Sequence, residues 1–271
     1  MSFRYFNEGL QYDALRQLRC RDRIEVSHGF SHTVFSAMTC IRCNQFREIF
    51  FVRRLLPTVI ILVSIAISVY GQSSSKTTKL WNGKDYTGWE FVSNSVTDLY
   101  AVCKIEPDNV LAVTGKPIGY LSTINSYENY RLHLEYRWPI GAEKNSNSGV
   151  LIHIASGPIE RNTWPLCFQI QTKISRAGDL LPMAGAKFTE TLSTAPEART
   201  PLLERLKSAS EKPVGEWNFV DIICRDSTIE CMINGIVQNR VTKCEPHAGK
   251  IGIQLEGVPF ELHNIWLILL D

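Results

Sequence analysis

The second half of the chain alternates hydrophobic and polar residues with the period of a β-strand. In residues 130–138 every second side chain is hydrophobic, from Tyr130 to Trp138, and the side chains between them are charged or polar. Successive side chains of a strand point to opposite faces, so one face of this strand is predicted to be buried and the other to be polar. Residues 149–154 (GVLIHI) are apolar on both faces, which is typical of a central, covered strand.

Further strands are bounded by turn signals. Residues 229–233 and 236–241 flank Asn234-Gly235, a dipeptide that tolerates the positive φ angles of a type I′ hairpin turn. Two more predicted strands, over residues 250–256 and 260–270, complete the chain. Thr200-Pro201 resembles an N-cap followed by proline, which predicts one short surface helix over residues 200–210. The pattern therefore predicts an all-β fold, a two-sheet antiparallel β-sandwich with one short helix.

A different kind of sequence precedes this domain. Residues 55–70 are apolar and uncharged, follow Arg53-Arg54 and precede small residues, which is the layout of a secretory signal cleaved before Gln72. A membrane anchor is the alternative, although an anchor normally needs about 20 apolar residues. The predicted parts are an unassigned extension or mis-called start (1–52), a signal or anchor (53–71), a linker (72–79) and a domain (80–271). We expect an exported protein, periplasmic, extracellular or held in the cell envelope.

Composition and charge narrow the function classes. The chain is 44% hydrophobic and 21% charged, which suits a globular protein, and its net charge of +2 does not indicate a nucleic-acid partner. Five cysteines follow Gln72, and this odd number with no compact spacing predicts small buried residues rather than a disulfide framework. Cys40 and Cys43 have no second pair at metal spacing, so they do not predict a metal site.

Six short motifs occur in the order seen in one known family. They are Leu80-Trp81-Asn82-Gly83 with Thr87-Gly88-Trp89, Glu135-Tyr136-Arg137-Trp138, Asn147-Ser148-Gly149-Val150, Gly215-Glu216-Trp217-Asn218, Gly249-Lys250-Ile251-Gly252 and His263-Asn264-Ile265. On these motifs the chain, from about Leu80 to Leu270, resembles the 3-keto-disaccharide hydrolase domain family. The resemblance implies a concanavalin A-like jelly roll with a concave polar face that accommodates a small carbohydrate.

The resemblance also implies a reaction. A ketone at C3 of a sugar acidifies the hydrogen on C2, so a base can remove it and expel the substituent on C1, after which water adds. We therefore expect an exported enzyme that cleaves 3-keto-disaccharides or 3-keto-glycosides, with Glu135 and His153 as its catalytic acid–base pair. The alternatives are that Glu135 forms an ion pair with Arg137 on a solvated face, and that His153 is a hydrogen-bonded core histidine.

One departure from the family pattern opens a second hypothesis. Where the family has a glutamate and a glutamine alternating on one strand face, this chain has Gln169 and Gln171. Glutamine cannot accept a proton as a general base. The alternative function is therefore a non-catalytic, lectin-like sandwich that binds a carbohydrate. Asp179 is a candidate to supply the missing carboxylate, and it is equally typical of a turn.

The remaining candidates would contact substrate. Asn147 and Ser148 could bind sugar hydroxyls or shape the turn before the next strand, and Trp164, in a loop containing proline, is predicted to be an exposed stacking platform. The other candidate substrate-binding residues are Arg137, Gln169, Gln171, Asp179 and Glu256. The sequence has no clear metal motif, so the cofactor stays unassigned, and a divalent-metal site assembled from different strands stays open.

Overall fold

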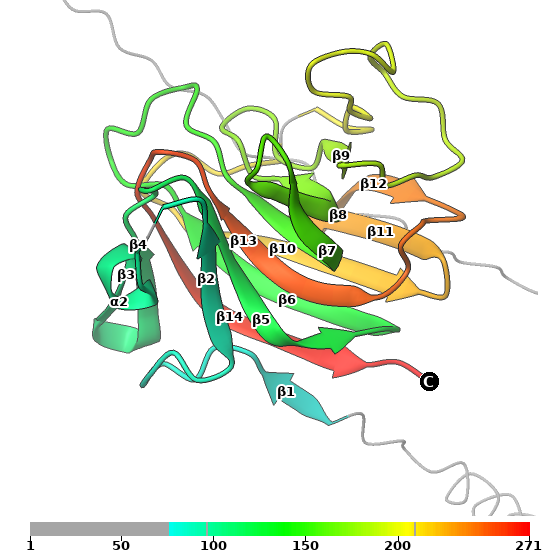
Figure 1. The fold of residues 1–271 in the computed structure, drawn as a ribbon. Coiled ribbons are helices and arrows are strands. Elements are labelled where there is room, and N and C mark those ends of the chain that lie inside the picture. The colour runs from blue at the N-terminus through cyan, green and yellow to red at the C-terminus, as the bar shows by residue number, and fades with distance from the viewer. Residues whose placement is uncertain (1–75, 96, 209) are drawn as a thin grey trace, which may run out of the picture. The chain divides into compact units, whose positions relative to one another are not determined.

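The structure is a computed structural model that describes residues 76–271, apart from residues 96 and 209 (Figure 1). The predicted extension, the signal or anchor over 53–71, and the Cys40 and Cys43 pair lie outside the described residues. Within the described part, no helix has both the length and the apolar character needed to cross a membrane.

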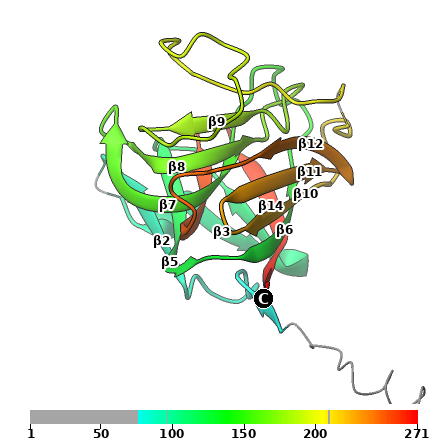
Figure 2. The ribbon, with the colours of Figure 1, turned by 90° about the vertical axis from the view of Figure 1, so that its right-hand side faces the viewer.

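Two antiparallel sheets form a sandwich, as the sequence predicts (Figures 1 and 2). In the described residues the larger sheet has eight strands in the order β12-β11-β10-β6-β14-β4-β3, with β1 paired to β14. Its strands are β1 (Thr77–Lys79), β3 (Cys103–Glu106), β4 (Val110–Val113), β6 (Tyr130–Arg137), β10 (Asn218–Arg225), β11 (Thr228–Ile233), β12 (Ile236–Val241) and β14 (Phe260–Leu269).

The smaller sheet has six strands in the order β2-β5-β13-β7-β8-β9. Its strands are β2 (Trp89–Ser93), β5 (Gly119–Tyr127), β7 (Gly149–Glu160), β8 (Trp164–Gln171), β9 (Leu180–Met183) and β13 (Gly249–Leu255). Segments far apart in sequence are therefore neighbours, because β13 pairs with both β5 and β7.

One hydrophobic core lies between the sheets, and the alternation of β6 shows how it forms. Tyr130, Leu132, Leu134 and Tyr136 are each at most 2% exposed and belong to this core, whereas His133 and Glu135 lie on the opposite, outer face. On the other side of the core, Phe168 of β8 is equally buried. Residues on the outer faces of the two sheets are consequently separated by the whole core.

The predicted hairpin and the predicted cysteine environment are confirmed. Asn234 and Gly235 join β11 to β12 with φ angles of 51° and 78°, as a type I′ turn requires. The five cysteines in the described part are buried and unpaired.

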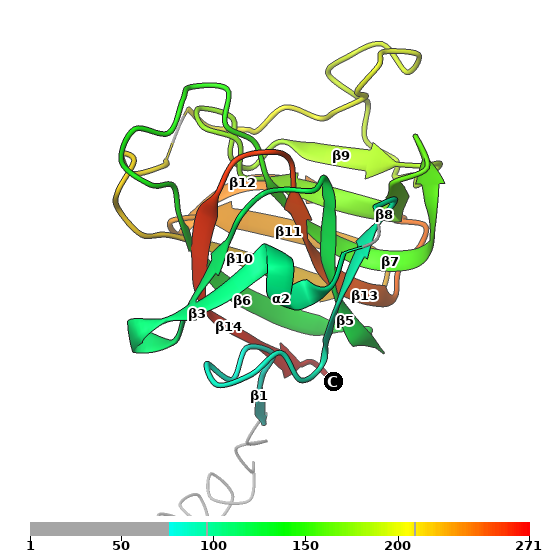
Figure 3. The same ribbon diagram turned by 60° about the vertical axis from the view of Figure 1, so that its left-hand side comes forward.

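The helix predicted over residues 200–210 does not form. Leu203 instead exchanges two backbone hydrogen bonds with Leu180 of β9, of 2.8 and 2.9 Å, so the segment is extended along the edge of the sheet. The pairing at this edge satisfies the backbone groups that a helix would have satisfied internally. The short α2 (Leu99–Val102), capped by Asp98, and a 3₁₀ turn η1 (Pro107–Asn109) lie elsewhere (Figure 3).

A β-bulge interrupts β7 at His153. The pairing with β13 shifts register between Leu151 and Ile154, and His153 has a left-handed φ of 55°. Gly249 of β13 accommodates this bulge, because a Cβ atom there would lie 2.6 Å from the backbone carbon of His153. The extra residue turns the imidazole away from the outer face and into the core.

Candidate functional site

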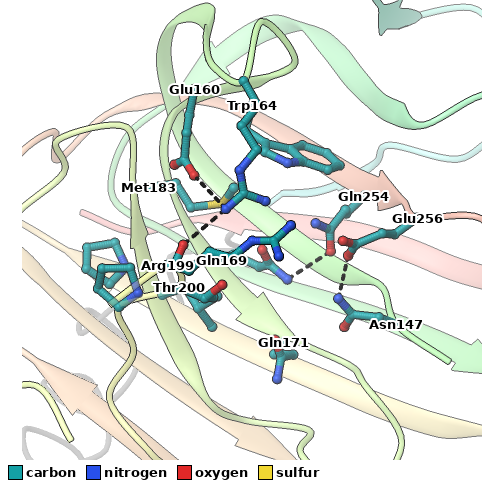
Figure 4. A pocket seen from close by; sticks show the side chains of 14 residues that line it. Asn147, Glu160, Trp164, Gln169, Gln171, Met183, Arg199, Thr200, Gln254 and Glu256 are labelled. Atoms are coloured by element: carbon teal, nitrogen blue, oxygen red, sulfur yellow. Dashed lines mark hydrogen bonds and ion pairs between the residues drawn. The ribbon is translucent and has the colours of Figure 1, made fainter. Parts of the chain in front are cut away.

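A polar pocket opens on the outer face of the six-stranded sheet (Figure 4). It contains about 490 Å³ of space, part of it open to solvent. Strands β7, β8, β9 and β13 contribute to it together with the connection between β9 and β10. Its polar lining residues are Asn147, Glu160, Arg161, Gln169, Gln171, Arg199, Thr200, Gln254 and Glu256, and Trp164 and Met183 are among the apolar ones.

A hydrogen bond between two glutamines forms the floor of the pocket. Gln169 Nε2 on β8 donates to Gln254 Oε1 on β13 over 2.9 Å, although β7 lies between these strands. The bridge passes over Gly149 of β7, where an added Cβ atom would lie 2.6 Å from the Gln169 side chain. The glycine therefore allows Gln169 to cross its neighbouring strand, which a residue with a side chain would obstruct.

Asn147 and Glu256 form the second polar pair of the pocket. Asn147 Nδ2 donates to Glu256 Oε2, while the buried Asn147 Oδ1 has no hydrogen-bond partner among the described residues. Burial raises the pKa of Glu256 above its ordinary value, and the bond from Asn147 offsets part of this effect. The pocket thus contains a carboxyl group with a raised pKa and a carboxamide oxygen that is free to accept a hydrogen bond.

Trp164 begins β8 at the edge of the same pocket. The sequence predicts an exposed stacking platform, and this prediction is wrong because the side chain is only 6% exposed. Trp164 packs with Leu181 and Met183 in a small apolar cluster on the outer face. Its contribution to a bound molecule is therefore limited to the part of the ring that lines the pocket.

Asp179 and Ser148 lie outside the lining and have structural roles. Asp179 is 1% exposed; its Oδ1 accepts from the backbone N–H of Arg205 over 3.0 Å and its Oδ2 from Arg176 over 2.7 Å. It thereby ties the β9–β10 connection to the sheet. Ser148 Oγ donates to the backbone carbonyl of Gln254 over 2.7 Å and positions the loop before β7. Both are corrections to the predicted substrate contacts.

Glu135 lies on the outer face of the other sheet. Its carboxylate accepts from His263 Nε2 over 2.7 Å and from Asn264 Nδ2 over 2.8 Å. Burial alone raises the pKa of Glu135, but the bonds from Asn264 and His263 outweigh it and lower the pKa below its ordinary value. The lowered pKa favours the ionised form of Glu135, which these two hydrogen bonds stabilise.

Arg137 also lies on this face, beside Glu135. Its Nε donates to Glu261 over 2.6 Å, and its guanidinium lies 4.5 Å from the ring centroid of Trp217. The Trp217 ring stacks on His263 at 3.8 Å, so it lies on the outer face of the sheet and not in the core. Arg137 therefore supports a surface cluster and does not reach the pocket.

His153 is fully buried in the core. Its ring packs edge to face against Tyr130 at 5.9 Å and Phe168 at 6.3 Å, and Nδ1 lies 3.2 Å from the carbonyl of Pro246. Burial lowers the pKa of His153 to about 4. The predicted pair of Glu135 and His153 is therefore not assembled, because one lies on an outer face and the other between the sheets.

Five of the ten predicted site residues meet in the pocket: Asn147, Trp164, Gln169, Gln171 and Glu256. Gln254 was missed, although it precedes Glu256 by two residues and so shares its strand face. Arg161 and Arg199 were missed because they lie in turns and connections, where no periodicity marks a side chain's direction. Among the described residues, no group of three or more histidine, cysteine, aspartate or glutamate side chains could hold a metal ion.

Comparison with known proteins agrees with the fold. Residues 76–268 match the family model described as a 3-keto-alpha-glucoside-1,2-lyase-like domain. None of the curated proteins compared with the chain matches it. A putative glycosyl hydrolase from Parabacteroides distasonis has a similar structure, with a TM-score of 0.51 and 21% identity over 73% of this chain and 96% of that one. A second one from that organism gives 0.50 and 18% over 72% and 100%.

Proposed function

Because the chain belongs to the 3-keto-alpha-glucoside-1,2-lyase-like domain family, we propose that it binds a small carbohydrate in the pocket on the six-stranded sheet. The observation that carries this proposal is the concentration of four carboxamide side chains there, Asn147, Gln169, Gln171 and Gln254. Each carboxamide both donates and accepts hydrogen bonds, as does each hydroxyl of a sugar. The structural neighbours support the fold of the domain but do not identify its ligand.

The donors and acceptors are already oriented. Gln169 is 2% exposed and Gln254 is 3% exposed, and their mutual bond fixes which atoms remain for a ligand. The unpartnered Asn147 Oδ1 is aligned by the bond from Nδ2 to Glu256. A ligand that supplies a hydroxyl donor to this oxygen removes the cost of leaving it unsatisfied. Binding therefore needs little ordering of the site.

The pocket favours binding over the acid–base chemistry expected from the sequence. Gln169 occupies the floor at a position where the family pattern has a glutamate, and a carboxamide cannot take a proton. Glu135 is separated from the pocket by the core, and His153 has no access to it. The function best supported is a lectin-like one, in which the sugar is held without a catalytic pair.

The presence of Glu256 in the pocket favours a second candidate function, cleavage of a 3-keto-glycoside. In its ionised form the carboxylate would take the hydrogen on C2, leaving an enolate that Gln169 Nε2 or a guanidinium could stabilise. The enolate would re-form the ketone, create a C1–C2 double bond and expel the C1 oxygen, which takes the proton back from Glu256. Water would then add across the double bond. The raised pKa of Glu256 suits a group that both accepts and returns a proton.

Binding and turnover of matched sugars test the two candidates. Purified protein is titrated calorimetrically with 3-keto-disaccharides and with their C3-hydroxyl counterparts, and products are followed chromatographically. Binding without products supports the lectin-like function, and products that disappear in Glu256→Gln support cleavage. Gln169→Ala should weaken binding, whereas Asn94→Ala, an exposed carboxamide outside the pocket, serves as the control. If no sugar of either series binds, both candidates are wrong.

We also propose that the protein is exported through residues 55–70. This proposal rests on the apolar run after Arg53-Arg54, which lies outside the described residues. The mass and N-terminal peptide of the native protein test it. A mature chain beginning at Gln72 is expected for cleavage, and a retained, membrane-associated segment would indicate the anchor.

A further inference from the structure

Two arginines lie along one side of the pocket, above its carboxamide floor. Arg161 follows β7, and Arg199 belongs to the connection between β9 and β10. Arg161 Nη2 donates to the backbone carbonyl of Arg199 over 3.1 Å, which joins the two segments at the pocket. Figure 4 shows the Arg199 side chain extending into the pocket toward Gln169 and Gln254.

Only one of these two arginines has a carboxylate partner among the described residues. Arg161 has Glu160 as a partner, with Nη2 3.6 Å from Oε1. Arg199 forms no ion pair with any carboxylate in the part of the chain that the structure describes. A pocket whose floor is built from neutral carboxamides thus contains a guanidinium without a counter-charge.

The only other carboxyl group of the lining does not provide that counter-charge. Glu256 is hydrogen bonded to Asn147 and forms no ion pair with Arg199 in the described part of the chain. Burial raises the pKa of Glu256, and Asn147, Lys173 and Arg161 oppose this shift. Arg199 therefore remains a positive charge of the lining without a carboxylate partner, and a positive charge in a cleft attracts and orients anions.

We propose that the pocket selects a carbohydrate with an anionic substituent, a carboxylate or a sulfate ester, which pairs with Arg199. The inference rests on the proposed function, since it assumes that this pocket binds a sugar. A guanidinium presents two parallel N–H donors that match either anion, so the structure defines the shared chemistry of the two. The pocket carboxamides would form hydrogen bonds with the hydroxyls of the sugar ring, and Arg199 would form an ion pair with the anionic substituent.

A matched set of three probes tests the inference on the full chain. The probes are methyl 3-keto-α-glucoside, its C6 carboxylate and its 6-sulfate, titrated calorimetrically at low and high salt. At least one anionic probe is expected to bind at least about fivefold more tightly than the neutral one, the value of a partly exposed charged hydrogen bond. Added salt should reduce this ratio.

Two variants test whether the preference for anionic probes depends on Arg199. Arg199→Gln should bring the affinity ratio between the anionic and neutral probes close to one. Arg240→Gln, an exposed arginine on β12 of the other sheet, is the matched control and should keep the ratio of the natural protein.

The outcomes separate this inference from the function on which it rests. A preference for the carboxylate alone or the sulfate alone supports the inference and identifies the anion. Equal affinities for all three probes, or a preference that survives Arg199→Gln, overturn the inference and leave the carbohydrate function standing. If none of the three probes binds, the carbohydrate function and the inference are both overturned.

Discussion

Gln169 on β8 donates a hydrogen bond of 2.9 Å to Gln254 on β13, across the intervening strand β7. The crossing is possible because Gly149 presents no side chain beneath it. The Asn147-Ser148-Gly149 motif thus has a physical explanation in this protein, since each of its residues supports the pocket. Asn147 orients Glu256, Ser148 holds the backbone of Gln254, and Gly149 leaves room for Gln169.

Gly149→Ala should weaken sugar binding without unfolding the protein. The new methyl group would lie 2.6 Å from the Gln169 side chain, which is flexible enough to move away and break its bond to Gln254. We expect a stability loss of about 1 kcal/mol and a roughly tenfold weaker affinity. Denaturant unfolding and calorimetric titration measure the two effects. Gly185→Ala, where a Cβ atom meets nothing within 4 Å but the φ of 101° is unfavourable for alanine, controls for a loss of stability that does not involve Gln169. Unchanged affinity in Gly149→Ala would show that the glutamine bridge is not part of the site.

Glu256 should make sugar affinity depend on pH. Its pKa is raised by burial, so the protonated form, which can donate to a sugar oxygen, persists above the ordinary pKa of a glutamate. Affinity is expected to fall as the pH rises through this raised pKa, and Glu256→Gln, which remains a donor, should remove the dependence. Titrations between about pH 4 and about pH 8 cover the relevant window. An identical pH profile in the variant would mean that another group titrates.

The raised pKa of Glu256 should also make the stability of the protein depend on pH. A carboxyl group whose pKa is raised in the folded state contributes stability at low pH that is lost as the pH rises through the folded pKa. Glu256→Gln should therefore be as stable as the natural protein at low pH and more stable near neutral pH. Thermal unfolding at the two pH values checks this, and a less stable variant at neutral pH would contradict it.

Glu135→Gln should reduce stability and leave sugar binding unchanged. The glutamine keeps an acceptor for Asn264 but loses the charged bond to His263, which we expect to cost about 1 kcal/mol. His263→Gln removes the imidazole that is hydrogen bonded to Glu135 and should give a similar loss. Unfolding free energies and affinities are measured for both variants. A loss of affinity in Glu135→Gln, with the fold intact, would restore Glu135 to the functional site.

His153 should make the protein less stable in acid. Its folded pKa of about 4 lies below the unfolded value near 6.5, so the unfolded chain binds the proton more readily between these values. The stability contribution is complete above about pH 6.5 and is lost as the pH falls toward 4, by about 3 kcal/mol in all. His153→Asn tolerates the same positive φ and should flatten this part of the stability curve. An equally steep acid loss in the variant would assign it to other groups.

Asp179→Ala should release the connection between β9 and β10. The substitution removes a partner of Arg176, whose side chain is 40% exposed, and the acceptor for the Arg205 backbone, and we expect the loss of these charged hydrogen bonds to cost about 2 kcal/mol. Limited proteolysis should cleave within residues 184–217 faster than in the natural protein. Asp179→Asn keeps one acceptor and should have a smaller effect. Equal protease resistance in both variants would show that Asp179 does not anchor this connection.

The sequence by itself determined the class of fold and the strands that build it. Alternation over residues 130–138 identified β6 and its buried face, and Asn234-Gly235 identified the β11–β12 hairpin, because both signals are local consequences of strand and turn geometry. The order of short motifs identified the family. The resemblance to the family also placed Gln169 and Gln171 on one strand face, where the pocket contains them.

The tertiary structure alone decided which of these side chains meet. Alternation would place His153 on the outer face, but the β7 bulge against Gly249 turns it into the core. Glu135 belongs to the other sheet, and the assignment of strands to sheets depends on long-range pairing that no local pattern records. The helix predicted over 200–210 gave way to pairing with Leu180, and that extended path brings Arg199 to the pocket. Strand faces are local properties, whereas a site assembled from β7, β8, β13 and a long connection depends on how the whole sandwich folds.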